Sequence, residues 1–191
     1  MMNRILLPLA LASATLLAQG PAQAAGFQLG SPDIKAGGLI DKKFEFNGFG
    51  CSGENKSPAL KWSGAPKDTK SFAVTMYDPD APTGSGWWHW SVINIPAGTN
   101  ELKADAGAAG GANLPKGAQP VRIDFGVAAW GGVCPPAGDK PHRYIFTVHA
   151  LKTDKLDIPA DATAALAGYM INGNSIGKAS FTAKYGRPKA K

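Results

Sequence analysis

"YDPDAPTGSGWWHW", residues 77–90, stands between two runs of apolar residues and gathers an unusual set of side chains in one turn. The stretch holds two aspartates, two prolines, three tryptophans and a histidine. Pro79 and Pro82 fix φ on either side of Asp80, so the chain turns rigidly there. A rigid turn that carries a carboxylate loses little conformational entropy when a guest binds, which suits the wall of a binding site. Read alone, "DPDAP" also fits plain turn chemistry, and that alternative stays open at this point.

Alternation of apolar and polar residues predicts β-strands on both sides of this turn and further along the chain. In "FAVTMYD", every second residue is a large apolar one: Phe72, Val74 and Met76. The predicted strands cover residues 44–50, 72–78, 89–95, 142–151 and 180–185. Glycine and proline are frequent throughout, as expected for short strands that are joined by many turns.

A single helix is convincing in the sequence. Leu166, Tyr169 and Met170 follow one another at i, i+3 and i+4, the spacing of one helix face. Asp161 or Thr163 stands before them as the N-cap. Helices are therefore expected to be peripheral in a fold that is made mainly of strands.

The chain is organised as one strand-rich domain over residues 25–191. Residues 103–120, "KADAGAAGGANLPKGAQP", are small and flexible in composition and predict a long surface loop. No internal repeat interrupts the pattern. We predict a mainly β fold of two packed antiparallel sheets with one or two peripheral helices.

The N-terminus is typical of a secretory signal peptide over residues 1–24. The basic start "MMNR" is followed by the apolar run "ILLPLALASATLLA" and then by small residues at Ala22–Ala24. The mature chain should therefore begin at Ala25 or Gly26, in the periplasm or outside the cell. A buried N-terminal helix is the alternative. No later stretch is apolar enough to predict a membrane span.

The formal net charge of +6 does not point to nucleic acid as a partner. Basic residues are scattered, apart from the pair Lys42–Lys43 and a tail with Lys184, Arg187, Lys189 and Lys191. They do not alternate with aromatic residues, as they would on a nucleic-acid-binding surface. We interpret the tail as a solvated end.

The chain contains two cysteines, Cys51 and Cys134. An even number of cysteines in an exported protein favours a disulfide. Closing so long a loop would stabilise the fold by about 4 kcal/mol in the chain-entropy model. Two free, buried thiols are the alternative.

A second cluster, "GGVCPPAGDKPHRY", covers residues 131–144 and ends at the start of a predicted strand. Alternation places His142 and Tyr144 on one face of that strand and His149 on the other. His149 is therefore interpreted as a structural histidine. His89 and His142 both open strands beside rigid loops, and we expect them to share one cavity.

The two clusters together resemble the phosphatidylethanolamine-binding protein family, also called Raf kinase inhibitor-like proteins, and especially its exported bacterial branch. The resemblance rests on several motifs in matching order. They are "NKSPALKW" (55–62), "YDPDAP" (77–82), "GSGWWHWSVINIP" (84–96), "DFG" (124–126) and "CPPAGDKPHRYIFTVHAL" (134–151). The resemblance implies a central antiparallel sheet packed on a smaller one, with a small anion pocket at one end. The turn at residues 77–90 is then one wall of a site.

The resemblance also implies the pocket residues. They correspond here to Asp78, Pro82, Trp87, His89, Gly132, Pro135, His142 and Tyr144. Trp130 and Val133 depart from the family's common residues, which leaves the shape of the rim open. The chain stops soon after its last strand, where eukaryotic members add a helix, so we expect a more open pocket.

The function that this resemblance implies is non-enzymatic binding of a small anion or phosphorylated headgroup, without a cofactor. A role in modulating an unidentified protein partner stays open, and the resemblance to bacterial members suggests a homodimer. Asp124–Phe125–Gly126 spells the kinase tripeptide, but the other kinase motifs are missing from the sequence.

The enzyme alternative is a hydrolase with Asp78 and a histidine as its acid–base pair, although the sequence shows no nucleophile motif. A zinc site of Asp78, His89 and His142 is a further alternative, and it lacks local ligand spacing. We therefore predict no metal site.

Overall fold

The computed structural model describes residues 26–189 of the 191-residue chain. The predicted signal peptide, residues 1–24, lies outside the described residues. Within residues 26–189, no helix is both long and apolar enough to cross a lipid bilayer.

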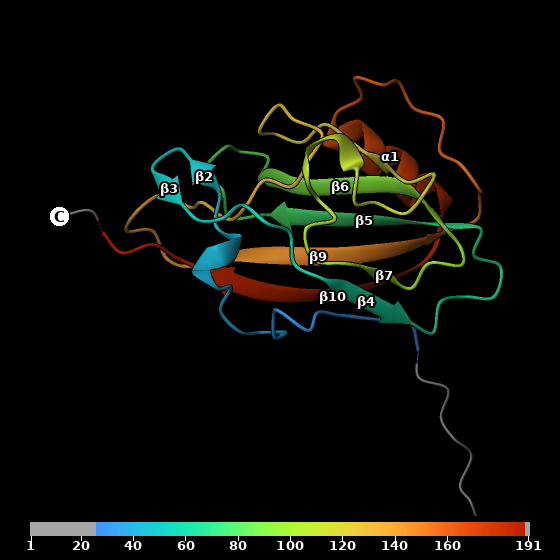
Figure 1. Cartoon of the computed structure of the whole chain (residues 1–191), viewed down its shortest axis with the longest axis horizontal. Helices are drawn as coiled ribbons and strands as arrows, with labels where there is room; N and C mark the ends of the chain where they lie inside the picture. Colours follow the sequence, from blue (N-terminus) through green and yellow to red (C-terminus); the bar gives the residue numbers. More distant parts are fainter. Residues whose placement is uncertain (1–25, 190–191) are drawn as a thin grey trace, which may run out of the picture.

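A five-stranded antiparallel sheet forms the centre of the fold, in the order β10-β9-β5-β6-β8 (Figure 1). Its strands are β5 (Ser71–Asp78), β6 (Trp87–Pro96), β8 (Gln119–Pro120), β9 (His142–Leu151) and β10 (Ser175–Tyr185). β5 pairs with β6 on one side and with β9 on the other. Because these neighbours run in opposite directions, the end of β5 and the starts of β6 and β9 meet at one end of the sheet.

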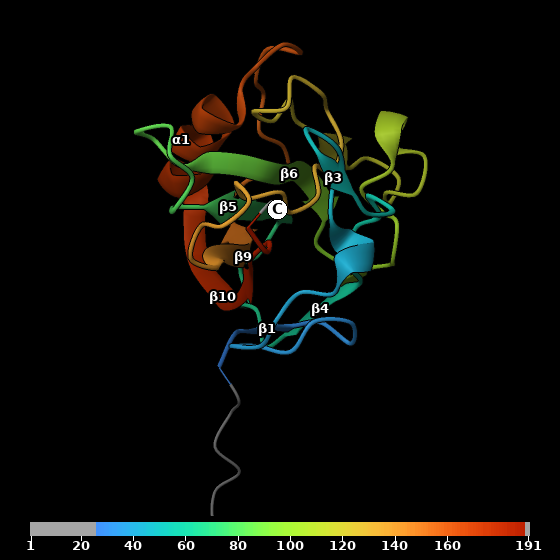
Figure 2. The same cartoon turned by 90° about the vertical axis from the view of Figure 1, so that its left-hand side faces the viewer.

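A smaller antiparallel sheet in the order β1-β4-β7 covers one face of the central sheet. It consists of β1 (Gln28–Gly30), β4 (Leu60–Ser63) and β7 (Glu101–Leu102). The short strands β2 (Asn47–Gly48) and β3 (Cys51–Ser52) form a separate hairpin. Figure 2 shows β3 and β4 on one side of the central strands and α1 on the other. The predicted mainly β fold of packed antiparallel sheets is confirmed.

The main hydrophobic core lies between the two sheets. Tyr144 and Phe146, alternate residues of β9, are fully buried in it. Phe146 stacks on Phe181 of β10 with ring centroids 4.8 Å apart. From the smaller sheet, Trp62 packs edge-on against Phe72 at 5.4 Å. The alternation that predicted the strands therefore also predicts which side chains fill this core.

The helix α1 (Ala164–Asn174) covers the opposite face of the central sheet (Figure 1). The Thr163 hydroxyl accepts a hydrogen bond from the backbone N–H of Leu166 at 3.3 Å. Thr163 is therefore the N-cap, as one of the two sequence-based alternatives predicts.

The side that α1 buries is not the one marked by the spacing of Leu166 and Tyr169. Ala164, Ala167 and Ile171 are buried, whereas Leu166 and Tyr169 are exposed. Two small alanines let the helix backbone lie close to the sheet, and the bulkier side chains then point outward. The spacing of large apolar residues correctly indicated a helix but not the face that it buries.

The strand predicted over residues 44–50 is mostly wrong. Only Asn47–Gly48 pairs as a strand, and Lys42–Phe44 forms a turn of 3-10 helix. Phe49 and Gly50 have φ values of 53° and 78°, which reverse the chain into β3.

The four other predicted strands are confirmed within β5, β6, β9 and β10. The predicted loop over residues 103–120 is irregular apart from a 3-10 turn at Ala109–Gly111 and the edge strand β8.

His149 lies on the α1 side of β9, as the alternation predicted. It stands opposite Ala73, a residue of the hydrophobic cluster beneath α1. The imidazole is buried, and its Nδ1 has no hydrogen-bond partner among the described residues. Burial, with a smaller contribution from Lys178, lowers the pKa of His149 to about 4.

Replacing this histidine should make the fold less sensitive to acid. Between pH ~6.5 and pH ~4 the unfolded chain binds a proton on His149 that the folded protein does not, so the free energy of unfolding falls as the pH falls. Over this pH range the free energy of unfolding falls by about 3 kcal/mol because of His149. We expect His149→Leu to remove most of this loss, measured as urea unfolding at pH 7 and at pH 4.5. If the wild type and His149→Leu lose the same free energy of unfolding between pH 7 and pH 4.5, the buried imidazole of His149 is not the cause of the acid sensitivity.

Candidate functional site

A cavity of about 190 Å³ opens at the end of the central sheet where β5 ends and β6 and β9 begin, the end that faces the viewer in Figure 2. It is smaller than pockets for drug-sized ligands, which are about 300–1,000 Å³. The lining residues are Phe49, Asp78, Ala81, Pro82, Thr83, Trp87, His89, Phe125, Cys134, Pro135, Pro136 and His142. The cavity therefore suits a small chemical group.

Asp78 and His142 form a buried pair at this cavity. The Nδ1 of His142 lies 2.8 Å from Oδ2 of Asp78, and Oδ1 of Asp78 accepts from the backbone N–H of Asp80 at 2.8 Å. With Asp78 ionised, Nδ1 of His142 donates to it, so Nε2 is the ring nitrogen left for a guest. The exposed Asp139 has a carboxylate oxygen 3.5 Å from this Nε2. Asp78 thus orients the His142 ring through Nδ1, and the Asp139 carboxylate lies near Nε2.

A β-bulge turns His89 toward the same cavity. Met76 pairs with Trp90 and Tyr77 with Trp88, so His89 is an extra residue on β6. Bulges of this kind change the direction of a side chain next to functional sites. The His89 ring consequently packs edge-on against Tyr144, on the core face, with centroids 5.2 Å apart.

The hydrogen bonds of His89 fix its tautomer. Its Nδ1 lies 2.8 Å from the carbonyl oxygen of Gly131 and 3.1 Å from that of Gly132, so Nδ1 must carry the proton. Burial lowers the pKa of His89, which favours the neutral ring when the cavity is empty. In that neutral ring Nε2 is an acceptor, and it becomes a donor only after protonation.

Asp80 anchors the turn that follows β5. Its carboxylate forms a bidentate pair with Arg143, with Nη2···Oδ1 at 2.7 Å and Nε···Oδ2 at 2.9 Å. Its Oδ2 also accepts from the backbone N–H of Arg143 at 2.8 Å. The hydrogen bonds from Arg143 lower the pKa of Asp80 to about 2. This pair joins the end of β5 to the start of β9 and so fixes the frame of the pocket.

Six of the eight predicted site residues line the cavity. They are Asp78, Pro82, Trp87, His89, Pro135 and His142.

Tyr144 and Gly132 lie behind this lining. Tyr144 is fully buried under His89, and burial, with a smaller contribution from Asp78, raises the pKa of its phenol. The N–H of Gly132 donates to Oδ1 of Asn55 at 2.8 Å, so this amide is engaged within the protein. A Cβ at Gly132 would come within 2.4 Å of the carbonyl oxygen of Phe44, which explains why glycine stands there. Tyr144 and Gly132 therefore support the cavity wall from behind.

Trp130 and Val133, the two departures from the family's common residues, do not change the cavity lining. Both are buried in the main core. Trp130 packs edge-on against Trp90, with ring centroids 5.5 Å apart. The rim is formed by other residues.

Two phenylalanines that are not among the predicted site residues form part of the rim. Phe125 packs edge-on against His89 at 5.3 Å and against Trp87 at 5.5 Å. Phe49, at the tip of the β2–β3 hairpin, stacks on Phe125 at 5.9 Å and is 76% exposed. Asp124 holds this segment to β6 by accepting from the backbone N–H of Trp88 at 2.7 Å. The "DFG" tripeptide thus has a structural role beside the pocket.

The Cys51–Cys134 disulfide ties the hairpin to the loop before β9. The bond is formed in the structure, with Cα atoms 6.0 Å apart. Cys134 itself lines the cavity, next to Pro135. The predicted pairing is confirmed, and it closes one wall of the site.

The C-terminal tail is docked on this same wall, so its interpretation as a solvated end is wrong for Arg187. The Arg187 guanidinium donates to the carbonyl oxygens of Gly50 and, at 3.2 Å, Pro135. Its Nε lies 3.7 Å from the buried carboxylate of Glu45. The backbone carbonyl of Arg187 also accepts from the N–H of Gly138 at 3.1 Å. The guanidinium therefore bridges the two segments that the disulfide joins.

A family model for phosphatidylethanolamine-binding proteins matches residues 30–186, and the chain belongs to this family. The UPF0098 protein YbcL of Escherichia coli is 57% identical over 164 residues, which cover 86% of this chain and 90% of YbcL. The crystal structure of E. coli YbcL, described as a new member of the mammalian PEBP family, matches with a TM-score of 0.83 and 54% identity. That match covers 87% of this chain and 100% of the YbcL chain. The putative lipoprotein LppC of Mycobacterium tuberculosis is 34% identical over 131 residues, 69% of this chain and 60% of LppC.

Removing the Arg187 side chain should loosen the hairpin wall without unfolding the sheet. We expect Arg187→Ala to increase amide hydrogen exchange over residues 47–53, because the carbonyl of Gly50 and the carboxylate of Glu45 lose their cationic partner. Exchange within β5 should stay unchanged. Lys189→Ala, which removes an exposed charge from the same tail, serves as the control. Unchanged exchange in the hairpin of Arg187→Ala would show that the disulfide alone holds the wall.

Proposed function

We propose that this chain is an exported binding protein that holds a small anionic group, either free phosphate or a phosphorylated headgroup, and does not convert it chemically. The arrangement of two histidines around one small cavity supports this most directly. The Nδ1 atoms of His89 and His142 both face protein acceptors, so a guest would meet their Nε2 atoms, and at His142 it would compete with the Asp139 carboxylate 3.5 Å away. An Nε2–H that donates to an anion requires that ring to be an imidazolium.

The charges around the cavity imply that a proton accompanies the anion. Asp78 is 2% exposed, and an unbalanced carboxylate there would repel a phosphate. Its contact with Nδ1 of His142 orients the ring and balances the charge of an imidazolium. A bound anion would thus contact the imidazolium of His142, and the Asp78 carboxylate would lie on the other side of that ring.

The contacts of the lining residues favour binding over hydrolysis. A hydrolase that uses Asp78 and a histidine as its acid–base pair also needs a nucleophile or a positioned water. The Thr83 hydroxyl in the lining donates to the backbone carbonyl of Gly86, and the Cys134 sulfur is in the disulfide. Neither group is activated by a neighbouring base.

Export is supported by two observations. Disulfides persist mainly in oxidising compartments, and the Cys51–Cys134 bond forms part of the pocket wall. A relative of this chain is named as a lipoprotein. We place the protein in the periplasm or outside the cell and extend the proposal to modulation of a partner protein there.

Anion binding should depend on His142 and on pH. We expect His142→Ala to weaken phosphate binding by about 1.5–3 kcal/mol, the range for a hydrogen bond to a charged group. Affinity should strengthen as the pH falls from about 8 toward about 6, until the phosphate itself takes up a proton, because a histidine must be protonated. Calorimetric titration of phosphate and of phosphoethanolamine at both pH values measures this, and comparing the two guests separates free phosphate from a headgroup.

His149→Ala is the matched control for this experiment, since it removes a buried imidazole from the opposite face of the same strand. It should leave affinity nearly unchanged at pH 8. Equal losses in the two variants, or an affinity independent of pH, would contradict the assignment of the site.

The proposal also predicts that the wild-type protein has no turnover. Phosphoesters, carboxylic esters and peptides should be processed no faster than by a mock preparation, because the lining offers no activated nucleophile. Reproducible turnover that disappears in both Asp78→Asn and His142→Ala would instead establish the hydrolase alternative.

A further inference from the structure

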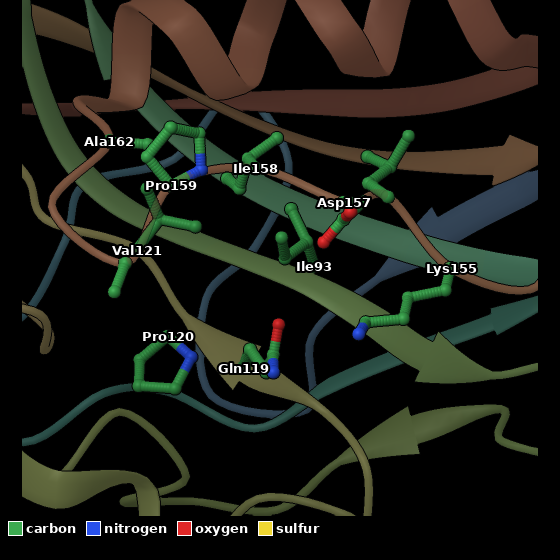
Figure 3. A pocket seen from close by; sticks show the side chains of 11 residues that line it. Ile93, Gln119, Pro120, Val121, Lys155, Asp157, Ile158, Pro159 and Ala162 are labelled. Carbon is green, nitrogen blue, oxygen red and sulfur yellow. The ribbon is translucent and has the colours of Figure 1, made fainter.

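A second hollow lies away from the anion pocket, between β6, β8 and the segment of residues 155–162 (Figure 3). Its volume is about 320 Å³, within the range of about 300–1,000 Å³ that small-molecule sites occupy. Its lining is mixed: Ile93 of β6, Val121 and Ile158 are apolar, and Gln119, Lys155 and Asp157 are polar or charged. It shares no lining residue with the anion pocket.

A buried asparagine holds the two sides of this hollow together. Asn94, with a φ of 57°, projects its side chain from β6. Its Oδ1 accepts from the backbone N–H of Leu156 at 2.7 Å, and its Nδ2 donates to the carbonyl of Leu156 at 3.3 Å. The same Nδ2 donates to Oε1 of Gln119 at 2.9 Å. The hollow is therefore built into the fold, and little ordering would be lost on binding.

Two side chains of opposite charge line the hollow. Lys155 and Asp157 both line it, and Figure 3 shows their charged ends turned toward its middle. Within residues 26–189, neither of them takes part in a salt bridge. Leu156 between them is buried in the cluster beneath α1, which fixes the segment that carries both charges. A lining that combines apolar side chains with one cation and one anion is complementary to a molecule that carries both charges on an apolar body.

We propose that this hollow binds a small zwitterion with an apolar side chain, an α-amino acid or a molecule with the same charge pattern. The carboxylate of the guest pairs with Lys155 and its ammonium with Asp157. The side chain of the guest packs on Ile158, which is only partly buried, and beside Val121. Because solvent screens exposed ion pairs, each charge contact is weak alone, and the two charges and the apolar contact act together.

Leucine and two analogues test the required charge pattern. Leucine methyl ester lacks the carboxylate, and 4-methylpentanoate lacks the ammonium group. We expect leucine to shift the methyl NMR resonances of Ile158 and Val121 at millimolar concentration, and both analogues to bind about fivefold more weakly. An absence of shifts at these methyl groups up to about 20 mM leucine would overturn the proposal.

Surface variants test the two charges with little risk to the fold. Lys155→Met and Asp157→Asn should each weaken leucine binding by about fivefold. Asp154→Asn, which removes a neighbouring charge outside the hollow, should leave it unchanged. Equal binding by leucine and 4-methylpentanoate, or equal losses in Asp157→Asn and Asp154→Asn, would show that the assigned charges do not recognise the guest. Phosphate binding at His142 is a separate readout, so either proposal can fail alone.

Discussion

Antiparallel pairing of β5 with β6 on one side and with β9 on the other is the constraint on which the candidate site depends. It brings the last residue of β5 and the first residues of β6 and β9 to one end of the sheet, although Asp78 and His142 lie 64 residues apart. Asp78 and His142 can then form a hydrogen bond between the neighbouring strands β5 and β9. The ion pair of Asp80 with Arg143 ties the same two strands just beyond it. The geometry of the pocket is therefore set by strand pairing.

The opposite wall has a different physical basis. A hairpin of two residues per strand has too few hydrogen bonds to be stable alone. Here the Cys51–Cys134 disulfide ties it to the loop before β9, and the Arg187 guanidinium donates to the carbonyls of Gly50 and Pro135 on both sides of that bond. The exposed Phe49 ring belongs to this hairpin. The cavity therefore lies between the ends of the sheet strands, which are fixed by pairing, and the hairpin, which is fixed by the disulfide and Arg187.

Buried titratable groups serve two separate purposes in this fold. On the α1 face, His149 stays neutral because burial penalises its charged form, and its role is structural. On the pocket face, Nδ1 of His89 faces backbone carbonyls and Nδ1 of His142 faces the Asp78 carboxylate, and the proposed anion site would couple guest binding to proton uptake at one of these rings. The difference comes from the neighbours of each ring: a carboxylate or carbonyls in the pocket, and no partner for Nδ1 of His149. The same residue type thus has different chemistry on the two faces of one sheet.

The sequence by itself determined four of the five predicted strands, the rigid turn after Asp78, the shared face of His142 and Tyr144, and the opposite face of His149. These follow from local alternation and from proline geometry, which act within a few residues. It also indicated the disulfide, because an even number of cysteines in a chain with a predicted signal peptide favours a disulfide. Matching motifs pointed to the family and to its pocket residues.

Only the tertiary structure decided how those residues are supported. Alternation on β6 does not show the bulge that turns His89 to the core face, because a bulge is a property of the paired strand. The hydrogen bond from Gly132 to Asn55 and the docking of Arg187 on Pro135 join segments that are distant in sequence. The buried face of α1 was likewise set by how closely small side chains let the helix approach the sheet. Each of these depends on non-local packing, which the periodicity of a single segment does not encode.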